Sequence, residues 1–365
     1  MKSNLFIVFT PFQLFVAQQI VKQEELNNNI LIKGWVAGNK HFLEIYDVIK
    51  IDEYWNKELI FPEISQIDGF RTNSLRDVKD AYNNFQKLKR IVLDNNVTNV
   101  YLGEIYNQSL RFIAVTLSHM GKSIYWFEEG SSHYVERAYI FDNSKQKDIK
   151  IKLRDLLYYM PLYHVKFARW RYNPGCPPKG LPMNGRFTII PGFYNEKFDK
   201  ILKVENIISD RTRDYINKNV NNEEEKRSLF VSQPREGKLE KCCFEVIQDF
   251  FSTYDKSKML YIKFHPREKQ EAKKCIEQIV SSLGIKYMIL SDEINIPIEL
   301  FLQQYKFDEI ILFDSSTYFY NGYIYPKTII ISLLPQLYTK CKTRRIGNLQ
   351  LMRNYMNKMN LEIPQ

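Results

Sequence analysis

The chain has 365 residues, which is more than one hydrophobic core usually holds, so two domains are expected. Its 44% hydrophobic and 26% charged residues match an ordinary globular protein and exclude a disordered chain, a collagen-like fibre and a multi-span membrane protein. The 52 Lys and Arg residues against 42 Asp and Glu residues give a net charge of +10, which favours polyanionic partners such as nucleic acid, anionic lipid, sugar nucleotides or acidic glycans.

The N-terminal part alternates strand and helix patterns. Residues 5–9 have the pattern of a buried strand, and Thr10 and Pro11 are suited to the N-cap and first turn of a helix. The alternation continues to residue 127 and predicts a parallel sheet with helices on both faces. The expected strands are 5–9, 29–36, 98–102 and 123–127, and the expected helices are 12–25, 76–93 and 109–120.

A second alternation begins near residue 228, after breaker residues at 173–178 and an acidic run at 221–225. It predicts a second doubly wound α/β unit. We therefore expect two Rossmann-like domains, 1–222 and 228–365, facing each other across a cleft. The expected strands are 228–232, 259–264, 286–290, 309–313 and 328–332, and the expected helices are 239–254, 268–283 and 297–305.

The five Cys residues show no zinc-finger spacing, and their odd number favours free thiols in a reducing compartment. No signal peptide is evident, and no apolar run reaches the roughly 18 residues of a membrane span. We expect a cytoplasmic protein that needs no cofactor and no metal ion.

Ligands of open parallel sheets bind beyond the carboxyl ends of the strands, so the residues that follow each strand are the first candidates for a site. Glu128, Glu129 and Gly130 follow the strand at 123–127. One carboxylate could act as a general base while its neighbour raises its proton affinity, although a solvated loop explains the motif equally well.

The strand at 259–264 leads into His265, with Lys263 on the same side of the strand and Pro266 suited to the first turn of a helix. An imidazole beside a helix N-terminus and a Lys could bind an anion and donate a proton to a departing phosphate. A simple helix cap is the alternative.

Ser315 and Ser316 follow the strand at 309–313. Hydroxyl groups at the start of a helix can bind phosphate, although ordinary capping accounts for them if they are considered alone. The three motifs together favour a functional site more than any one of them does, because carboxylates, a His and hydroxyls all follow strands. These strands are divided between the two expected domains.

In this order, the acid-acid-Gly, His-Pro and Ser-Ser motifs resemble those of bacterial sialyltransferases with the GT-B fold. These are the lipooligosaccharide sialyltransferases (family 52) and the capsular polysialyltransferases (family 38). The opening stretch from Phe9 to Leu14, with Thr10, Pro11 and Gln13, is similar to their Thr-Pro-x-Gln start. The likeness runs to about Phe319, although Glu-Glu replaces the commoner Asp-Asp.

The resemblance implies a role for each matching residue. It also implies an acceptor-binding first domain with the catalytic base and a second domain that binds the CMP-sugar. The implied roles are Glu128 as catalytic base; His265 as general acid; Lys263, Pro266, Glu299, Ser315 and Ser316 in donor binding; and Thr10, Gln13, Glu129 and Gly130 on the acceptor side.

The family's chemistry is an inverting, metal-independent transfer from CMP-sialic acid to a glycan hydroxyl. The resemblance implies a galactoside of a bacterial surface lipooligosaccharide or capsule as acceptor, with α2,8 elongation by a polysialyltransferase as the alternative. Another GT-B glycosyltransferase using a different sugar nucleotide is a further alternative within the enzymes.

Residues 150–172 mix basic and aromatic side chains and could contact an anionic membrane, although an amphipathic helix pair packed on the first domain is the simpler interpretation. The net charge also allows a basic glycan- or nucleic-acid-binding protein. No nucleic-acid-binding motif is recognisable, so we expect no nucleic-acid partner.

Overall fold

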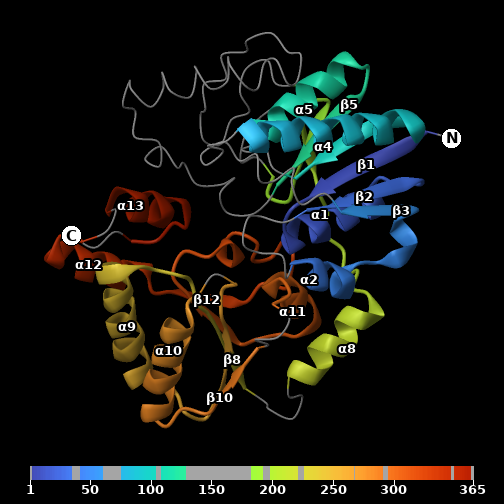
Figure 1. The fold of residues 1–365 in the computed structure, drawn as a ribbon. Coiled ribbons are helices and arrows are strands. Elements are labelled where there is room, and N and C mark those ends of the chain that lie inside the picture. Colours follow the sequence, from blue (N-terminus) through green and yellow to red (C-terminus); the bar gives the residue numbers. More distant parts are fainter. Residues whose placement is uncertain are drawn as a thin grey trace. The chain divides into compact units, whose positions relative to one another are not determined.

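The computed structural model is described for residues 2–34, 42–60, 75–103, 108–128, 182–191, 198–220, 226–266, 268–290, 295–346 and 349–362 (Figure 1). It divides into two compact units, Met1–Ser209 and Asp210–Gln365. The division falls before the boundary near 222–228 expected from the sequence. Helix α8 (Asp210–Asn219) belongs to the second unit, where Tyr305 donates a hydrogen bond to Asn217 Oδ1 over 2.7 Å.

The first unit contains a parallel sheet of seven described strands in the order β3-β2-β1-β4-β5-β6-β7. Helices α4 and α5 cover one face of the sheet, and α1 and α2 lie on the other (Figure 1). The described elements are β1 (Ser3–Val8), α1 (Pro11–Gln23), β2 (Asn29–Lys33), α2 (Phe42–Ile49), the 3₁₀ turn η1 (Asp52–Tyr54), β3 (Lys57–Ile60), α4 (Leu75–Asp94), β4 (Val97–Leu102), α5 (Gln108–His119), β5 (Ser123–Phe127), β6 (Gly185–Thr188) and β7 (Asp199–Ile201).

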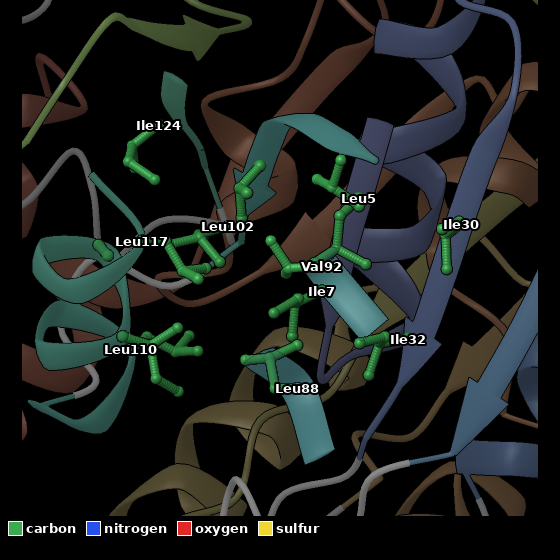
Figure 2. Packing of buried hydrophobic residues seen from close by; sticks show 14 of the residues in the cluster. Leu5, Ile7, Ile30, Ile32, Leu88, Val92, Leu102, Leu110, Leu117 and Ile124 are labelled. Atoms are coloured by element: carbon green, nitrogen blue, oxygen red, sulfur yellow. The ribbon is translucent and has the colours of Figure 1, made fainter. Parts of the chain in front are cut away.

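The two-residue repeat of the strands divides their side chains between the two faces. Leu5 and Ile7 of β1 lie in a hydrophobic core beneath α4 and α5 (Figure 2). On the opposite face, Phe6 stacks on Tyr101 with ring centroids 4.3 Å apart, and Tyr101 stacks on Tyr125 at 4.9 Å. Burial on both faces explains why these strands are almost continuously hydrophobic in sequence.

The second unit contains a parallel sheet of five described strands in the order β10-β9-β8-β11-β12. Helices α9, α10 and α12 pack together on one face. The remaining elements are β8 (Arg227–Val231), α9 (Gly237–Ser252), β9 (Met259–Lys263), α10 (Gln270–Ser282), β10 (Tyr287–Ile289), α11 (Ile298–Gln304), β11 (Glu309–Leu312), the 3₁₀ turn η4 (Ser316–Tyr318), β12 (Ile329–Ser332), α12 (Leu334–Arg344) and α13 (Leu349–Lys358).

The predicted fold class is confirmed, because both sheets are parallel and doubly wound with the same order of their first five strands. In each sheet the order reverses beside a central strand, between β1 and β4 and between β8 and β11. Such a reversal is where open α/β sheets bind their ligands. Within the residues described, no helix is both long and apolar enough to cross a membrane.

Candidate active site

Glu128 follows β5 at the carboxyl edge of the first sheet. Its side chain is buried, with 1% of the residue exposed, and its Oε2 accepts a hydrogen bond of 2.9 Å from the backbone N–H of Ile189. Ile189 follows β6, the strand paired with β5. The carboxylate is therefore fixed across two neighbouring strand ends. Glu129 and Gly130, which were predicted beside it, lie outside the described residues.

Thr10 and Gln13 lie where β1 leads into α1. Thr10 caps the helix, because its hydroxyl accepts the Gln13 N–H at 3.2 Å. The Gln13 side chain is fully buried: its Oε1 accepts the Phe9 N–H at 2.6 Å, and its Nε2 donates to the Gly103 carbonyl at 3.2 Å. These contacts join the ends of β1 and β4, so both residues have a structural role. Their part in acceptor binding stays a prediction.

Gly103 completes this junction because only glycine fits there. A Cβ atom at Gly103 would lie 2.6 Å from Gln13 Cδ and 2.8 Å from Phe127 Cε2, both far inside normal contact distance. The buried position of the Gln13 amide therefore requires a glycine at position 103.

His265 is half-buried and follows β9 at the carboxyl edge of the second sheet. Two hydrogen bonds join His265 and Glu268: the Glu268 N–H donates to the His265 carbonyl at 2.9 Å, and the Glu268 Oε2 accepts the His265 N–H at 3.3 Å. Helix α10 begins only at Gln270. The expectation that Pro266 occupies the first turn of this helix is therefore wrong, because the helix starts after Glu268, whose carboxylate accepts the His265 N–H.

Lys263 and Glu299 are both buried, with 4% and 5% of each residue exposed. Lys263 Nζ donates to Asn295 Oδ1, and Asn295 Nδ2 donates to the Phe264 carbonyl at 3.2 Å. Burial raises the pKa of Glu299 to about 7, although a hydrogen bond from its own backbone and the Lys263 charge oppose the shift. Two predicted donor-binding residues are thus near enough to interact electrostatically.

Ser315 and Ser316 follow β11, but they begin a single 3₁₀ turn and not an α-helix. The Ser315 hydroxyl accepts the Thr317 N–H at 3.3 Å and lies 3.0 Å from Thr317 Oγ1. Ser315 is buried, whereas Ser316 is half-buried. Ser315 therefore acts as the cap that the simpler interpretation expects, and Ser316 is the more accessible hydroxyl.

Sequence reasoning overlooked the loop that follows β8. Arg235 forms an ion pair with Asp314. Burial is the largest influence on the pKa of Arg235 and lowers it, but the charge and hydrogen bond of Asp314, together with smaller contributions from Cys243 and Tyr355, outweigh burial and raise the pKa. Ser232 Oγ lies 2.6 Å from both carboxylate oxygens of Glu268, whose pKa is raised by burial. The available signal was the polar stretch Gln233-Pro234-Arg235, which directly follows the strand predicted at 228–232.

The described site residues lie at or beside the carboxyl edge of their own sheet. In the second unit the Lys263–His265 loop and the Ser315–Ser316 loop follow β9 and β11, the two neighbours of β8. Cationic and hydroxyl groups there can stabilise a departing phosphate. Across the described part of the chain, no group of three or more His, Cys, Asp or Glu side chains could hold a metal ion.

Two solved structures with a similar architecture are described as epimerases of a sugar nucleotide. A protein described as a UDP-N-acetylglucosamine 2-epimerase from Listeria monocytogenes matches at 11% identity with a TM-score of 0.50, over 98% of this chain and 88% of the other. The UDP-GlcNAc 2-epimerase from Methanocaldococcus jannaschii matches at 14% identity with a TM-score of 0.49, over 100% and 94%. At such identities the first of these likenesses shows the fold alone, the GT-B type.

The family model of the alpha-2,8-polysialyltransferases matches residues 4–334 of the chain. This range includes both sheets and every described site residue. No curated protein sequence matches the chain significantly. The chain therefore belongs to the alpha-2,8-polysialyltransferase family and is a glycosyltransferase of the sialyltransferase type, as the sequence motifs predict.

Proposed function

We propose that the protein transfers sialic acid from CMP-sialic acid to a glycan acceptor, with inversion at the sialyl C2 carbon, and that it elongates an α2,8-linked chain. The observation that carries this proposal is the family match over residues 4–334. It favours α2,8 elongation over the single transfer to a galactoside that the sequence motifs placed first. The predicted CMP-sugar site in the second unit, and the acceptor site in the first, are parts of the same proposal.

Glu128 is the proposed general base, which takes the proton from the attacking hydroxyl of the acceptor. The hydrogen bond from the Ile189 N–H supports this role, because it holds the carboxylate in one orientation at the strand end. A positioned base of this kind contributes roughly 10²- to 10⁴-fold to a rate. Glu129 and Gly130, the next two residues in sequence, are proposed to contribute to the acceptor side.

His265 is the proposed general acid, which donates a proton to the departing phosphate of CMP. Lys263 contributes positive charge, and the Ser316 hydroxyl donates a hydrogen bond to the phosphate oxygens while Ser315 shapes the turn. Glu299 accepts hydrogen bonds from the donor's ribose. Because these groups offset the developing charge, we expect transfer to proceed without a divalent cation, which an assay with a chelator tests.

The two catalytic assignments are tested by Glu128→Gln and His265→Ala. Each variant should lose transfer by at least about 10²-fold, measured as CMP release, while its far-UV circular dichroism stays that of the wild type. Glu44→Gln and His119→Ala change exposed residues of the same types and should keep full activity. Wild-type rates in either catalytic variant would overturn its assignment.

Donor and acceptor are tested separately. Calorimetry with CMP, UDP and GDP should show preferential binding of CMP; a preference for UDP would move the protein to another glycosyltransferase branch. With CMP-sialic acid as donor, α2,8-linked oligosialic acid should be elongated and a simple galactoside should not. Transfer of one residue to the galactoside alone would instead support the lipooligosaccharide type of acceptor.

Cytoplasmic location with peripheral attachment to an anionic membrane stays a prediction, since residues 150–172 lie outside the described residues. Flotation with anionic liposomes tests it. The wild type should float, and a variant with charge reversals at Lys166, Arg169 and Arg171 should remain with the soluble fraction. Failure of the wild type to float would remove the membrane from the proposal.

A further inference from the structure

The loop at residues 232–235 contacts both loops that carry the proposed phosphate-binding groups. It follows β8, the strand that pairs with β9 on one side and with β11 on the other. One end of the loop contacts the turn after β9, and the other contacts the turn after β11. We call residues 232–235 the bridging loop.

On the β9 side, the bridging loop holds the turn of His265 through Ser232. The Ser232 hydroxyl contacts the Glu268 carboxylate at 2.6 Å, and the same carboxylate accepts the His265 N–H at 3.3 Å. The Ser232 N–H also donates to the Lys263 carbonyl at 3.0 Å, which extends the β8–β9 ladder by one bond. Glu268 therefore fixes the backbone of His265 to the end of the central strand.

On the β11 side, the bridging loop holds Asp314, the residue before Ser315. Gln233 Oε1 accepts the Asp314 N–H at 2.9 Å, and the Arg235 guanidinium pairs with the Asp314 carboxylate. Both the backbone and the side chain of Asp314 are thus fixed, and its side chain is only 10% exposed. A buried charge pair with additional hydrogen bonds is costly to break, so this turn has little freedom.

We propose that the bridging loop is a positioning segment that sets the separation between His265 and the Ser315–Ser316 turn. The inference rests on the proposed function, in which these groups act on one phosphate. Strands β9 and β11 are not paired with each other, because β8 lies between them. A misplacement of about 1 Å in such a site can cost about 100-fold in rate, so a device that fixes this separation has catalytic consequences.

The β9 side is tested by Glu268→Ala, which removes the contacts to Ser232 and to His265. We expect kcat to fall about 10- to 100-fold with the donor KM nearly unchanged, because binding survives and the acid is misplaced. Glu268→Gln should restore most of the rate, since its amide can accept from the His265 N–H and donate to Ser232 Oγ. Glu271→Ala removes an exposed carboxylate of the first turn of α10 and should have no effect.

The β11 side is tested by Gln233→Leu, which keeps the size of the side chain but removes the acceptor for the Asp314 N–H. Here we expect the donor KM to rise about 10-fold with a smaller change in kcat, because the phosphate-binding turn is displaced. Gln233→Asn retains a neutral amide acceptor on a shorter side chain and should restore part of the KM without adding a charge beside Asp314. Equal changes in kcat and KM for the two sides, or no rescue by Glu268→Gln and by Gln233→Asn, would overturn the proposal.

A measurement without turnover separates this inference from the proposed function. The chain has five His residues, so the imidazole signal of His265 can be assigned in an NMR spectrum by comparison with His265→Ala. Glu268→Ala should shift and broaden this signal, and Glu268→Gln should leave it near the wild-type position. If Glu268→Ala is too unstable to study, Ser232→Ala provides the smaller change.

The outcomes are distinguishable. An unmoved His265 signal in Glu268→Ala and in Ser232→Ala overturns the positioning role, whatever the enzyme transfers. A moved signal together with full activity of His265→Ala overturns the proposed catalytic function and leaves the structural link intact.

Discussion

The two units share the strand order around their central strands. They differ in the residues that join the strand ends and loops at the point where this order reverses. In the first unit the neutral Gln13 amide joins the ends of β1 and β4 through two backbone groups. In the second unit the Arg235–Asp314 ion pair and Gln233 join the loops after β8 and β11. The first arrangement fills its junction with a buried amide, whereas the second gathers charged groups where an anionic donor is proposed to bind.

A carboxyl group in each unit has a shifted pKa, and the two shifts have opposite directions. In the first unit, burial raises the pKa of Glu58, but hydrogen bonds and charges from Lys50 and Lys33 outweigh it and hold that pKa below its usual value. In the second unit, burial raises the pKa of Glu299 to about 7. Acidification should therefore remove the stabilising contribution of Glu58 and favour the protonated, buried form of Glu299.

Breaking the junction of the first unit should give the largest effect on stability. Gln13→Leu leaves the Phe9 N–H and the Gly103 carbonyl buried without their partner, at a cost of about 3–5 kcal/mol. All four Trp residues precede residue 209, so a urea titration followed by Trp fluorescence reports on this unit. These are Trp35, Trp55, Trp126 and Trp170.

Gln23→Leu is the matched control for this variant. The Gln23 amide also bridges two backbone groups, the Ile201 carbonyl at 3.1 Å and the Lys203 N–H at 2.8 Å, but both contacts are exposed. Water can replace that amide, so its loss should cost less than about 1 kcal/mol. Equal losses in the two variants would show that burial of the Gln13 junction is not what makes it stabilising.

Glu299→Gln tests how much Glu299 contributes to the pH dependence of the stability of the second unit. Between about pH 4.5 and 7 the folded state keeps Glu299 protonated while the unfolded state releases the proton, so stability is lost as the pH rises through this window. The full shift corresponds to about 3 kcal/mol, and the Gln variant should lack this slope. Urea unfolding followed by circular dichroism at pH 5 and pH 7.5 measures it.

The exposed Glu271 provides the comparison for Glu299, since Glu271→Gln should leave the pH slope unchanged. Trp fluorescence should show no change in either variant, because the second unit contains no Trp. A slope that persists in Glu299→Gln would assign the pH dependence to another group.

Gly103→Ala tests how tightly the first junction is packed. Its added Cβ would lie 2.6 Å from Gln13 Cδ, and such overpacking costs about 1–3 kcal/mol. Because part of the clash is with the Gln13 side chain, Gly103→Ala should be less harmful in a Gln13→Ala background than alone. Additive losses in this double-mutant cycle would place the strain elsewhere, for example at Phe127.

Local patterns predicted the central strands of the first sheet and all five described strands of the second, because strands that are buried on both faces are continuous apolar runs in sequence. The shorter strands β3, β6 and β7 of the first sheet lack such runs and were missed. Strand β5 has the predicted bounds, Ser123–Phe127, and β12 differs from its expected range by one residue. The position of Glu128, His265 and Ser315 after strands follows from the same patterns. The alternation of strand and helix patterns therefore predicts most of the fold and the location of the candidate site.

What the patterns missed depends on partners that are distant in sequence or on single side chains. Helix α10 begins at Gln270, and Glu268, which the helix was expected to include, instead accepts a hydrogen bond from the His265 N–H. The contact of Arg235 with Asp314 spans 79 residues, and that of Gln13 with Gly103 spans 90. No periodicity encodes such contacts, so the sequence predicts the loops but not the links between them.

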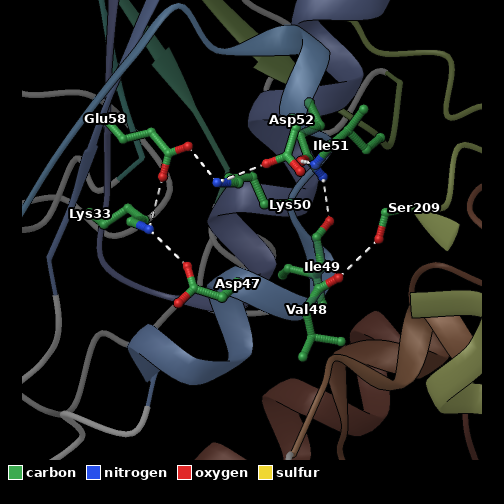
Figure 3. Close-up of polar contacts among 10 residues, drawn as sticks. Lys33, Asp47, Val48, Ile49, Lys50, Ile51, Asp52, Glu58 and Ser209 are labelled. Carbon is green, nitrogen blue, oxygen red and sulfur yellow. Dashed lines mark hydrogen bonds and ion pairs between the residues drawn. The ribbon is translucent and has the colours of Figure 1, made fainter. Parts of the chain in front are cut away.

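The smallest predicted effect concerns the ion pairs of the first unit (Figure 3). Glu58 contacts both Lys50 and Lys33, whose side chains are only 11% and 8% exposed. Glu58→Gln should cost about 1 kcal/mol at pH 7, because Asp52 and Asp47 remain as partners for the two lysines.

The loss in Glu58→Gln should shrink as the pH falls below about 4.5, since the lowered pKa of Glu58 means that its contribution is present above that pH and lost below it. Trp fluorescence during urea unfolding at pH 7 and pH 4 measures both values. Asp52→Asn removes a partner that is 65% exposed and should cost still less. If Glu58→Gln is as stable as the wild type at pH 7, these ion pairs do not stabilise the first unit, and of the two carboxyl groups compared only Glu299 makes stability depend on pH.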